Sequence, residues 1–204
     1  MPVFFQQQIN EHTRLGIWKI EETEEFFSQN VPVQQNVSHP KKRLQHLAGR
    51  FLLQFLFPDF PYELIQIADT RKPYLADAKY HFSISHCGDY AAAIVSRDSR
   101  VGIDIEIPVE KIRLIRWKFL QKEELQRFTQ NDVEFDDHHL LTLLWSCKEA
   151  VFKWYGDGEV DFRQHIQLSN RQEETIDCFF GKNESKPIIN YRIFGGLVLA
   201  WIVS

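Results

Sequence analysis

The most informative segment of this 204-residue chain is Val101-Gly102-Ile103-Asp104-Ile105-Glu106. On a β-strand, side chains two residues apart share a face, so Ile103 and Ile105 are expected to point towards a core and the two carboxylates towards the opposite face. Two carboxylates on one rigid strand suit a hard divalent cation, above all magnesium, which keeps water ligands and is often completed by substrate phosphates. Alternating acidic residues also occur on exposed strands without any ligand. Other motifs in the sequence are therefore needed to distinguish a cation site from an exposed acidic strand without a ligand.

The remaining pattern alternates between helical and extended segments. Apolar residues at helical spacing predict one long helix over about 38–57, capped by Ser38, and a second over about 140–155, ended by Gly156. Short strands are expected at 3–9, 15–20, 64–68, 82–85, 90–96, 102–107, 164–169, 175–180, 188–194 and 197–203. We therefore predict an α+β fold of two similar halves, residues 1–99 and 100–204, each with a long helix packed on a small, mainly antiparallel sheet.

Composition limits the possible partners. A hydrophobic content of 44% indicates a packed globular protein, and a net charge of -4 gives no overall basic field, so no nucleic acid is expected. Three widely spaced cysteines match neither a disulfide framework nor a zinc motif, which is typical of a cytoplasmic protein with reduced thiols. No signal peptide is expected, and the longest apolar run, 197–203, is too short to span a bilayer.

A second chemical motif lies in the second long helix, Trp145-Ser-Cys-Lys-Glu-Ala150 followed by Lys153. If this helix crosses the strand that carries Asp104 and Glu106, Glu149 becomes a third carboxylate. Lys148 and Lys153 would then flank the same cavity and supply positive charge to phosphate oxygens. The alternative is an ordinary exposed Lys/Glu helix face.

Histidines supply weaker signals. His86 ends the strand Phe82-Ser-Ile-Ser-His86 and is a candidate donor to a phosphate, whereas its neighbour Ser85 is too close in sequence to form a Ser-His-Asp triad with it. His138 and His139 are adjacent, and because neighbouring side chains diverge by about 100° on a helix, no metal site is expected there.

Four motifs occur in an order that resembles a known family. Arg71-Lys-Pro-Tyr-Leu75 is followed by Phe82–His86, by Gly102–Glu106, and by the Trp145–Lys153 helix segment. Together they resemble the 4′-phosphopantetheinyl transferases of the Sfp type, and Phe119-Leu-Gln-Lys-Glu-Glu124 is similar to the segment that precedes the second long helix in that family. Each motif is weak alone, but their order over about residues 40–160 is specific.

The resemblance implies a cytoplasmic, magnesium-dependent enzyme, a monomer whose halves are related by a pseudo-twofold axis, with coenzyme A bound between them. It would transfer the phosphopantetheine arm of coenzyme A to a serine of an apo carrier protein and release adenosine 3′,5′-bisphosphate. By position, the metal ligands are Asp104, Glu106 and Glu149, and the catalytic residues are Glu149, Lys148 and Asp104. The coenzyme A contacts are Arg71, Lys72, Pro73, Ser85, His86, Lys148 and Lys153.

The chain also departs from the family pattern. Ser83 and Cys87 stand where the family commonly has Asn and Ser, Glu159 stands where it commonly has an apolar residue after the second long helix, and Gln34-Gln35 stands where it usually has a basic pair. The 3′-phosphate is therefore expected to meet one residue of the first long helix, from Lys41, Lys42, Arg43 and Arg50.

Carrier proteins of this class present an acidic helix, and residues 111–122 offer basic and aromatic side chains to receive it. Docking is expected at Arg113, Arg116 and Trp117, although an aromatic core residue with solvated cations gives the same pattern.

Two other functions are compatible with the carboxylates Asp104, Glu106 and Glu149. One is another magnesium-dependent phosphate-transfer or hydrolytic enzyme, which the Arg71–Leu75 and Ser83–His86 motifs disfavour because a small phosphate needs no adenosine cradle. The other is a noncatalytic carrier-binding protein, which the presence of all three carboxylates disfavours.

Overall fold

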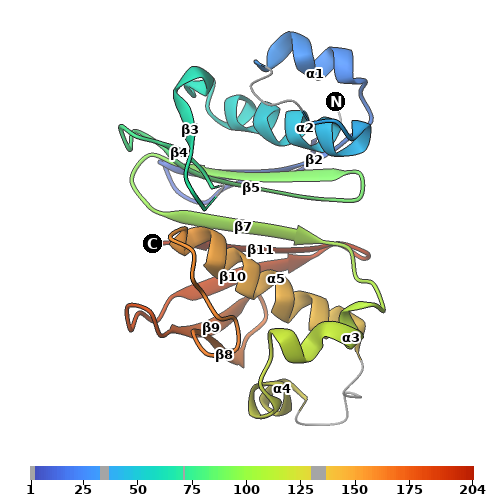
Figure 1. Ribbon diagram of the computed structural model, residues 1–204, viewed down its shortest axis with the longest axis vertical. Coiled ribbons are helices and arrows are strands. Elements are labelled where there is room, and N and C mark those ends of the chain that lie inside the picture. The colour runs from blue at the N-terminus through green and yellow to red at the C-terminus, as the bar shows by residue number, and fades with distance from the viewer. Residues whose placement is uncertain (1–2, 33–36, 71, 130–136) are drawn as a thin grey trace.

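Two antiparallel sheets form the framework of the computed structural model, which describes residues 3–32, 37–70, 72–129 and 137–204 (Figure 1). The first sheet has the order β1 (Val3–Gln8), β2 (Thr13–Lys19), β6 (Tyr90–Ser96) and β5 (His81–Cys87). The second has the order β7 (Val101–Glu106), β11 (Val198–Val203), β10 (Ile188–Ile193), β9 (Thr175–Phe180) and β8 (Ile166–Arg171). A short ribbon pairs β3 (Ile65–Ile67) with β4 (Pro73–Leu75).

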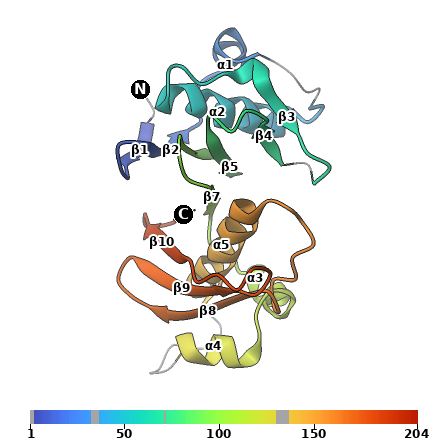
Figure 2. The ribbon, with the colours of Figure 1, turned by 90° about the vertical axis from the view of Figure 1, so that its left-hand side faces the viewer.

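One long helix packs on each sheet, as Figures 1 and 2 show. The helix α2 (Pro40–Leu56) covers β6, β2 and β5, and α5 (His138–Tyr155) covers β7 and β11. The remaining helical segments are α1 (Glu24–Asn30), η1 (Tyr62–Leu64), α3 (Ile112–Ile115), η2 (Arg116–Lys118) and α4 (Lys122–Phe128). The predicted α+β class with mainly antiparallel sheets is confirmed.

The start of α2 differs from the prediction. The helix begins at Pro40, and its N-cap is His39, whose Nδ1 accepts a hydrogen bond from the Lys42 amide at 3.5 Å. Ser38 is therefore not the cap. Proline favours the first helical position because its missing N–H would have no intrahelical partner there, and it forces the preceding residue into extended backbone.

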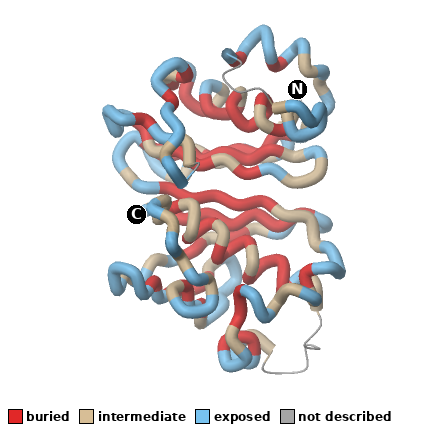
Figure 3. Tube along the Cα trace, in the orientation of Figure 1, coloured by how far each residue is buried: buried red, intermediate tan, exposed pale blue. Residues whose placement is uncertain are grey.

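The two sheets meet along β5 and β7. Their faces turned away from the long helices share an apolar cluster that includes Ile17, Ile94, Ile103 and Ile105, and Figure 3 shows the buried band that runs through the middle of the molecule. The strand β7 therefore has no solvated face, because isoleucines fill this cluster on one side and α5 covers the other. The pseudo-twofold axis and the boundary at residue 100 remain predictions.

Side chains, rather than a backbone ladder, connect β5 to β7. The Ile103 amide donates to Ser83 Oγ at 3.2 Å, and the Ile107 amide lies 3.3 Å from Cys87 Sγ. We call this contact between β5 and β7 the seam. It aligns the residues of both sheets that form the site described next.

Candidate active site

Close packing of α5 against β7 brings the predicted carboxylates together. Gly102 makes this possible, because a Cβ at that position would overlap the Ala150 carbonyl oxygen and the Trp154 backbone nitrogen. With only a hydrogen there, the helix lies directly on the strand, and its side chains reach Asp104.

Asp104 is the centre of the site. It is only 2% exposed, and three side chains donate to its carboxylate. Ser85 Oγ and Lys153 Nζ reach Oδ1 at 2.8 and 2.7 Å, and Ser146 Oγ reaches Oδ2 at 2.9 Å. A buried carboxylate needs such donors to offset the loss of water. The network joins β5, β7 and α5 at one point beside the seam.

Glu106 and Glu149 complete a cluster of three carboxylates. Burial, with the nearby charge of Asp104, raises the pKa of Glu149 to about 7, although Lys153 acts in the opposite direction. Burial and Asp104 also raise the pKa of Glu106, whose side chain interacts with Cys87 and Trp145. The three carboxylates are thus close enough for the charge on Asp104 to raise the pKa of both glutamates; a divalent cation beside such carboxylates would stabilise their ionised forms.

Lys148 does not face this cluster. Its ammonium is fully buried and donates to Glu124 Oε2 at 2.8 Å, to Phe162 O at 2.9 Å and to Ile166 O at 2.6 Å. A lysine has three N–H donors, so none remains for a phosphate. This corrects the expectation that Lys148 flanks the cavity and acts as a catalytic or coenzyme-binding residue: it joins α5 to α4, to Phe162 and to the first residue of β8.

A basic row on α2 faces His86 of β5. Lys42, His46 and Arg50 are each four residues apart and so share one face of the helix. Burial lowers the pKa of His46 to about 4, with further contributions from Arg50 and His86, and no described side chain or backbone group bonds its buried Nε2. Sequence reasoning considered Lys42 and Arg50 but missed His46, although the four-residue spacing was visible.

Arg43 and Lys41, the other two residues of this helix expected to meet the 3′-phosphate, form contacts away from His86. Arg43 makes a two-pronged contact with Glu24, at 2.7 and 2.8 Å, and also donates to Val37 O. Lys41 pairs with Asp89 at 3.0 Å on the surface. Neither faces His86 in this arrangement, which leaves Lys42 and Arg50 of the four residues proposed for the 3′-phosphate.

A cavity of about 220 Å³ lies next to the Asp104 network and is lined by Lys72, Pro73, Ser83 and Lys153, among others. Burial lowers the pKa of Lys72, and Arg100 contributes to the same effect. Partial desolvation lowers the pKa of His86, and Lys153 contributes. Arg71, also predicted to contact the coenzyme, lies outside the described residues.

The predicted docking residues form a surface group on α3 and η2. Arg116 lies over the Trp117 ring, with 5.0 Å from Cζ to the ring centroid, and donates to Arg113 O. Leu114 is 81% and Trp117 44% exposed. The group therefore combines apolar surface with guanidinium charge.

The adjacent histidines prove closer than predicted. The His138 and His139 ring centroids are 4.2 Å apart, and ligand atoms of Asp137, His138 and His139 lie within 4.8 Å of one another. The expectation that the two rings diverge is therefore wrong. However, they lie at the N-terminus of α5, where the helix dipole disfavours a cation.

Comparison with known proteins adds independent information. The family model described as "4'-phosphopantetheinyl transferase superfamily" matches residues 100–201, half of the chain. Enterobactin synthase component D of Escherichia coli (strain K12) is 34% identical over 116 residues, which cover 55% of this chain and 54% of that protein. A putative 4'-phosphopantetheinyl transferase of Haemophilus influenzae is 31% identical over 128 residues, covering 60% and 53% of the two chains. The chain thus spans about half the length of these relatives.

A further relative is matched over more of its length. The 4'-phosphopantetheinyl transferase AcpT of Escherichia coli O157:H7 is 28% identical over 137 residues, which cover 63% of this chain and 68% of that protein.

Among the described helices, none has the length and apolar character needed to cross a bilayer.

Proposed function

The chain belongs to the 4′-phosphopantetheinyl transferase superfamily, and from this premise we propose that it transfers the phosphopantetheine arm of coenzyme A to an apo acyl or peptidyl carrier protein in the cytoplasm. The serine oxygen of the carrier forms a bond to the phosphorus that bears pantetheine. The bond from that phosphorus to the bridging pyrophosphate oxygen breaks, and adenosine 3′,5′-bisphosphate leaves. The observation that carries the proposal is the convergence of Lys153, Ser85 and Ser146 on buried Asp104 beside Glu149.

Charge control is the main task in such a reaction, because phosphoryl transfer depends on positioning and electrostatic stabilisation. Asp104, Glu106 and Glu149 would hold Mg²⁺, which neutralises negative charge on the pyrophosphate when bound. Lys153, now paired with Asp104 at 2.7 Å, would turn its ammonium to a phosphate oxygen.

Glu149 is the proposed acceptor of the serine proton. A pKa raised to about 7 matches a general base that works near neutral pH. A bound cation would lower that pKa, and Glu149 would still offer a carboxylate oxygen to the serine proton.

The rest of coenzyme A would lie along the seam. Lys72 and Pro73 would contact the adenosine from the cavity that they share with Lys153. His86 and the basic row Lys42, His46 and Arg50 would surround the 3′-phosphate, because these side chains lie close enough to affect one another's charge and together offer cationic and N–H donors. Carrier docking is proposed at Arg113, Arg116 and Trp117, with Leu114 added.

The test is the mass of an apo carrier protein after incubation with the enzyme, coenzyme A and Mg²⁺. We expect a gain of one phosphopantetheine that requires both coenzyme A and Mg²⁺. Glu149→Gln should abolish the gain and keep the circular dichroism spectrum, while Glu11→Gln, a matched change at an exposed residue, should keep full activity. Full activity of Glu149→Gln would reject the assignment.

The same experiment separates the other two functions. Phosphate release from coenzyme A without a heavier carrier would indicate a hydrolase. Carrier binding without any mass gain or phosphate release would indicate a noncatalytic binding protein.

A further inference from the structure

Cys87, the last residue of β5, lies beside Glu106, the last residue of β7. The two strands run in the same direction along the seam, and the Ile107 amide, directly after Glu106, donates to Cys87 Sγ at 3.3 Å. The turn after the thiol is fixed as well, because Gly88 O accepts from Gln45 Nε2 of α2 at 2.8 Å, and a Cβ on Gly88 would overlap the Ile107 side chain. The thiol is therefore held in place next to Glu106.

The Glu106 carboxylate receives a donor from each of the two elements that lie against β7. Burial raises the pKa of Glu106 most, whereas hydrogen bonds from the Cys87 thiol of β5 and the Trp145 indole of α5 lower it. The indole is itself anchored, because the ring of Trp145 packs against Phe119 and Phe162, with ring centroids 5.1 and 5.5 Å apart. Two fixed side chains thus set the orientation of this carboxylate.

Asp104, two residues earlier on β7, is held in the same way. Ser85 of β5 and Ser146 of α5 each donate to its carboxylate. Ser85 and Cys87 are two residues apart and so share one face of β5. The matching period of two on both strands places one β5 donor against each β7 carboxylate. Hydrogen bonds that orient ligand carboxylates have a large effect on metal affinity in proteins.

We propose that Cys87 is a positioning residue for the divalent cation, whose thiol holds Glu106 in the orientation that binds the ion. The inference rests on the proposed function, since it takes Asp104, Glu106 and Glu149 as the cation ligands. A thiol is both a weak donor and a weak acceptor, so it can accept from the Ile107 amide and donate to Glu106 at the same time. Cys87 itself does not contact the cation, coenzyme A or the carrier.

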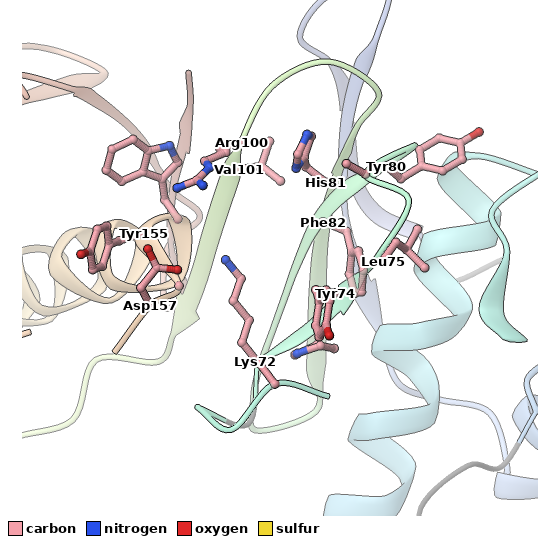
Figure 4. Close-up of a pocket in the computed structure, with 15 residues that line it drawn as sticks. Lys72, Tyr74, Leu75, Tyr80, His81, Phe82, Arg100, Val101, Tyr155 and Asp157 are labelled. Carbon is pink, nitrogen blue, oxygen red and sulfur yellow. The ribbon is translucent and has the colours of Figure 1, made fainter. Parts of the chain in front are cut away.

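The contact between Cys87 and Glu106 lies at the far end of the seam from a cavity of about 320 Å³. That cavity is lined by His81, the first residue of β5, by Val101, the first residue of β7, and by Lys72 (Figure 4). A change at Cys87 should therefore leave the cavity unchanged, and an effect on cation binding would not arise from it.

The test is the binding of Mn²⁺, which takes the same oxygen ligands as Mg²⁺, to the protein without coenzyme A or carrier. The free-ion signal in electron paramagnetic resonance measures the affinity. Cys87→Ala should weaken binding about tenfold, and Cys87→Ser, which keeps a group that donates and accepts, should stay within about twofold of the parent protein. Cys178→Ala is the matched control, because it removes a buried thiol from β9, which two strands separate from β7. It should leave the Mn²⁺ affinity unchanged.

A second background separates the contact with Glu106 from the link to the Ile107 amide. Glu106→Ala removes the carboxylate that the thiol holds, so adding Cys87→Ala should then weaken Mn²⁺ binding by less than about twofold. A further loss of about tenfold in that background would mean that Cys87 acts through the seam alone, and would overturn the proposal. An unchanged affinity in Cys87→Ala, no recovery in Cys87→Ser, or no Mn²⁺ binding by the parent protein would overturn it as well.

The carrier mass assay separates this inference from the proposed function. In Cys87→Ala the Mg²⁺ concentration for half-maximal transfer should rise about tenfold, while the rate at saturating Mg²⁺ should fall less than about twofold. Transfer with an unchanged Mg²⁺ requirement would reject the role of Cys87 and keep the proposed function. Mn²⁺ binding that depends on Cys87 in a protein without transfer activity would support that role and reject the proposed function.

Discussion

Lys148 and Lys153 show how the position of one residue on a helix decides its task. Five residues correspond to about 140° around a helix, so the two side chains point to different sides. Glu149 and Lys153 are four residues apart and share a face. Helical geometry alone therefore excluded the expectation that both lysines line one cavity, and the structure assigns Lys153 to Asp104 and Lys148 to Glu124.

The two lysines predict opposite phenotypes. Lys148→Met leaves Glu124 buried without its cation, so we expect a loss of about 3–5 kcal/mol in the free energy of unfolding. Lys153→Met should cost less stability than Lys148→Met, because the Lys153 side chain is 25% exposed whereas that of Lys148 is fully buried, but it should slow transfer about a hundredfold. Urea unfolding and the carrier mass assay measure the two effects.

A second substitution provides the control for Lys148. Glu124→Gln added to Lys148→Met removes the unpaired charge and should recover part of the stability. Equal stability of Lys148→Met and the parent protein would contradict the role assigned to the buried pair.

At the scale of an element, the contact between α5 and β7 depends on one missing methyl group. Gly102→Ala would force the helix away from the strand, since the new Cβ overlaps backbone atoms that cannot move alone. We expect a loss of about 1–3 kcal/mol in stability and a larger loss of transfer, because Lys153 and Glu149 move with the helix. Thermal unfolding and carrier modification test this.

Gly196→Ala is the matched control, because a Cβ there meets no atom within 4 Å. It should leave stability and transfer unchanged. If Gly102→Ala behaved like Gly196→Ala, the tight helix–strand contact would not matter for the site.

The α3–η2 segment makes a kinetic prediction. Arg116→Glu should raise the KM for the carrier about tenfold by charge repulsion with an acidic helix, while coenzyme A binding stays the same. Lys182→Glu, at an exposed turn between β9 and β10, is the control with the same charge change. Carrier kinetics that respond equally to both substitutions would place docking elsewhere.

Elements proved easier to predict than contacts between them. Period-two patterns predicted most strands to within two residues, and helical spacing predicted both long helices. They missed β4, because a three-residue strand that starts with proline carries no periodic signal, and they misplaced the cap of α2. The burial of Lys148 depends on Glu124, 24 residues away in sequence, which no local pattern contains.

The whole molecule should respond to acid in two opposed ways. An unfolded histidine binds a proton near pH 6.5, whereas His46, with its pKa lowered to about 4, stays neutral when folded, so it costs stability as the pH falls through that window. Glu149, with its pKa raised to about 7, binds a proton in the folded state before the unfolded state does, so it adds stability as the pH falls.

Two variants separate these contributions. Between pH 7.5 and 5, His46→Gln should lose less unfolding free energy than the parent protein, and Glu149→Gln should lose more. Urea unfolding at both pH values measures the difference. Parallel behaviour of all three proteins would mean that neither group changes its pKa on folding.

The seam has a consequence for how this protein can diversify. A backbone ladder between two sheets is the same whatever the sequence, but here Ser83 and Cys87 supply the acceptors for the Ile103 and Ile107 amides. Point mutation can lengthen, weaken or remove each of these links without disturbing either sheet. Substitution of Ser83 or Cys87 therefore changes how tightly the two sheets meet beside the Asp104 network.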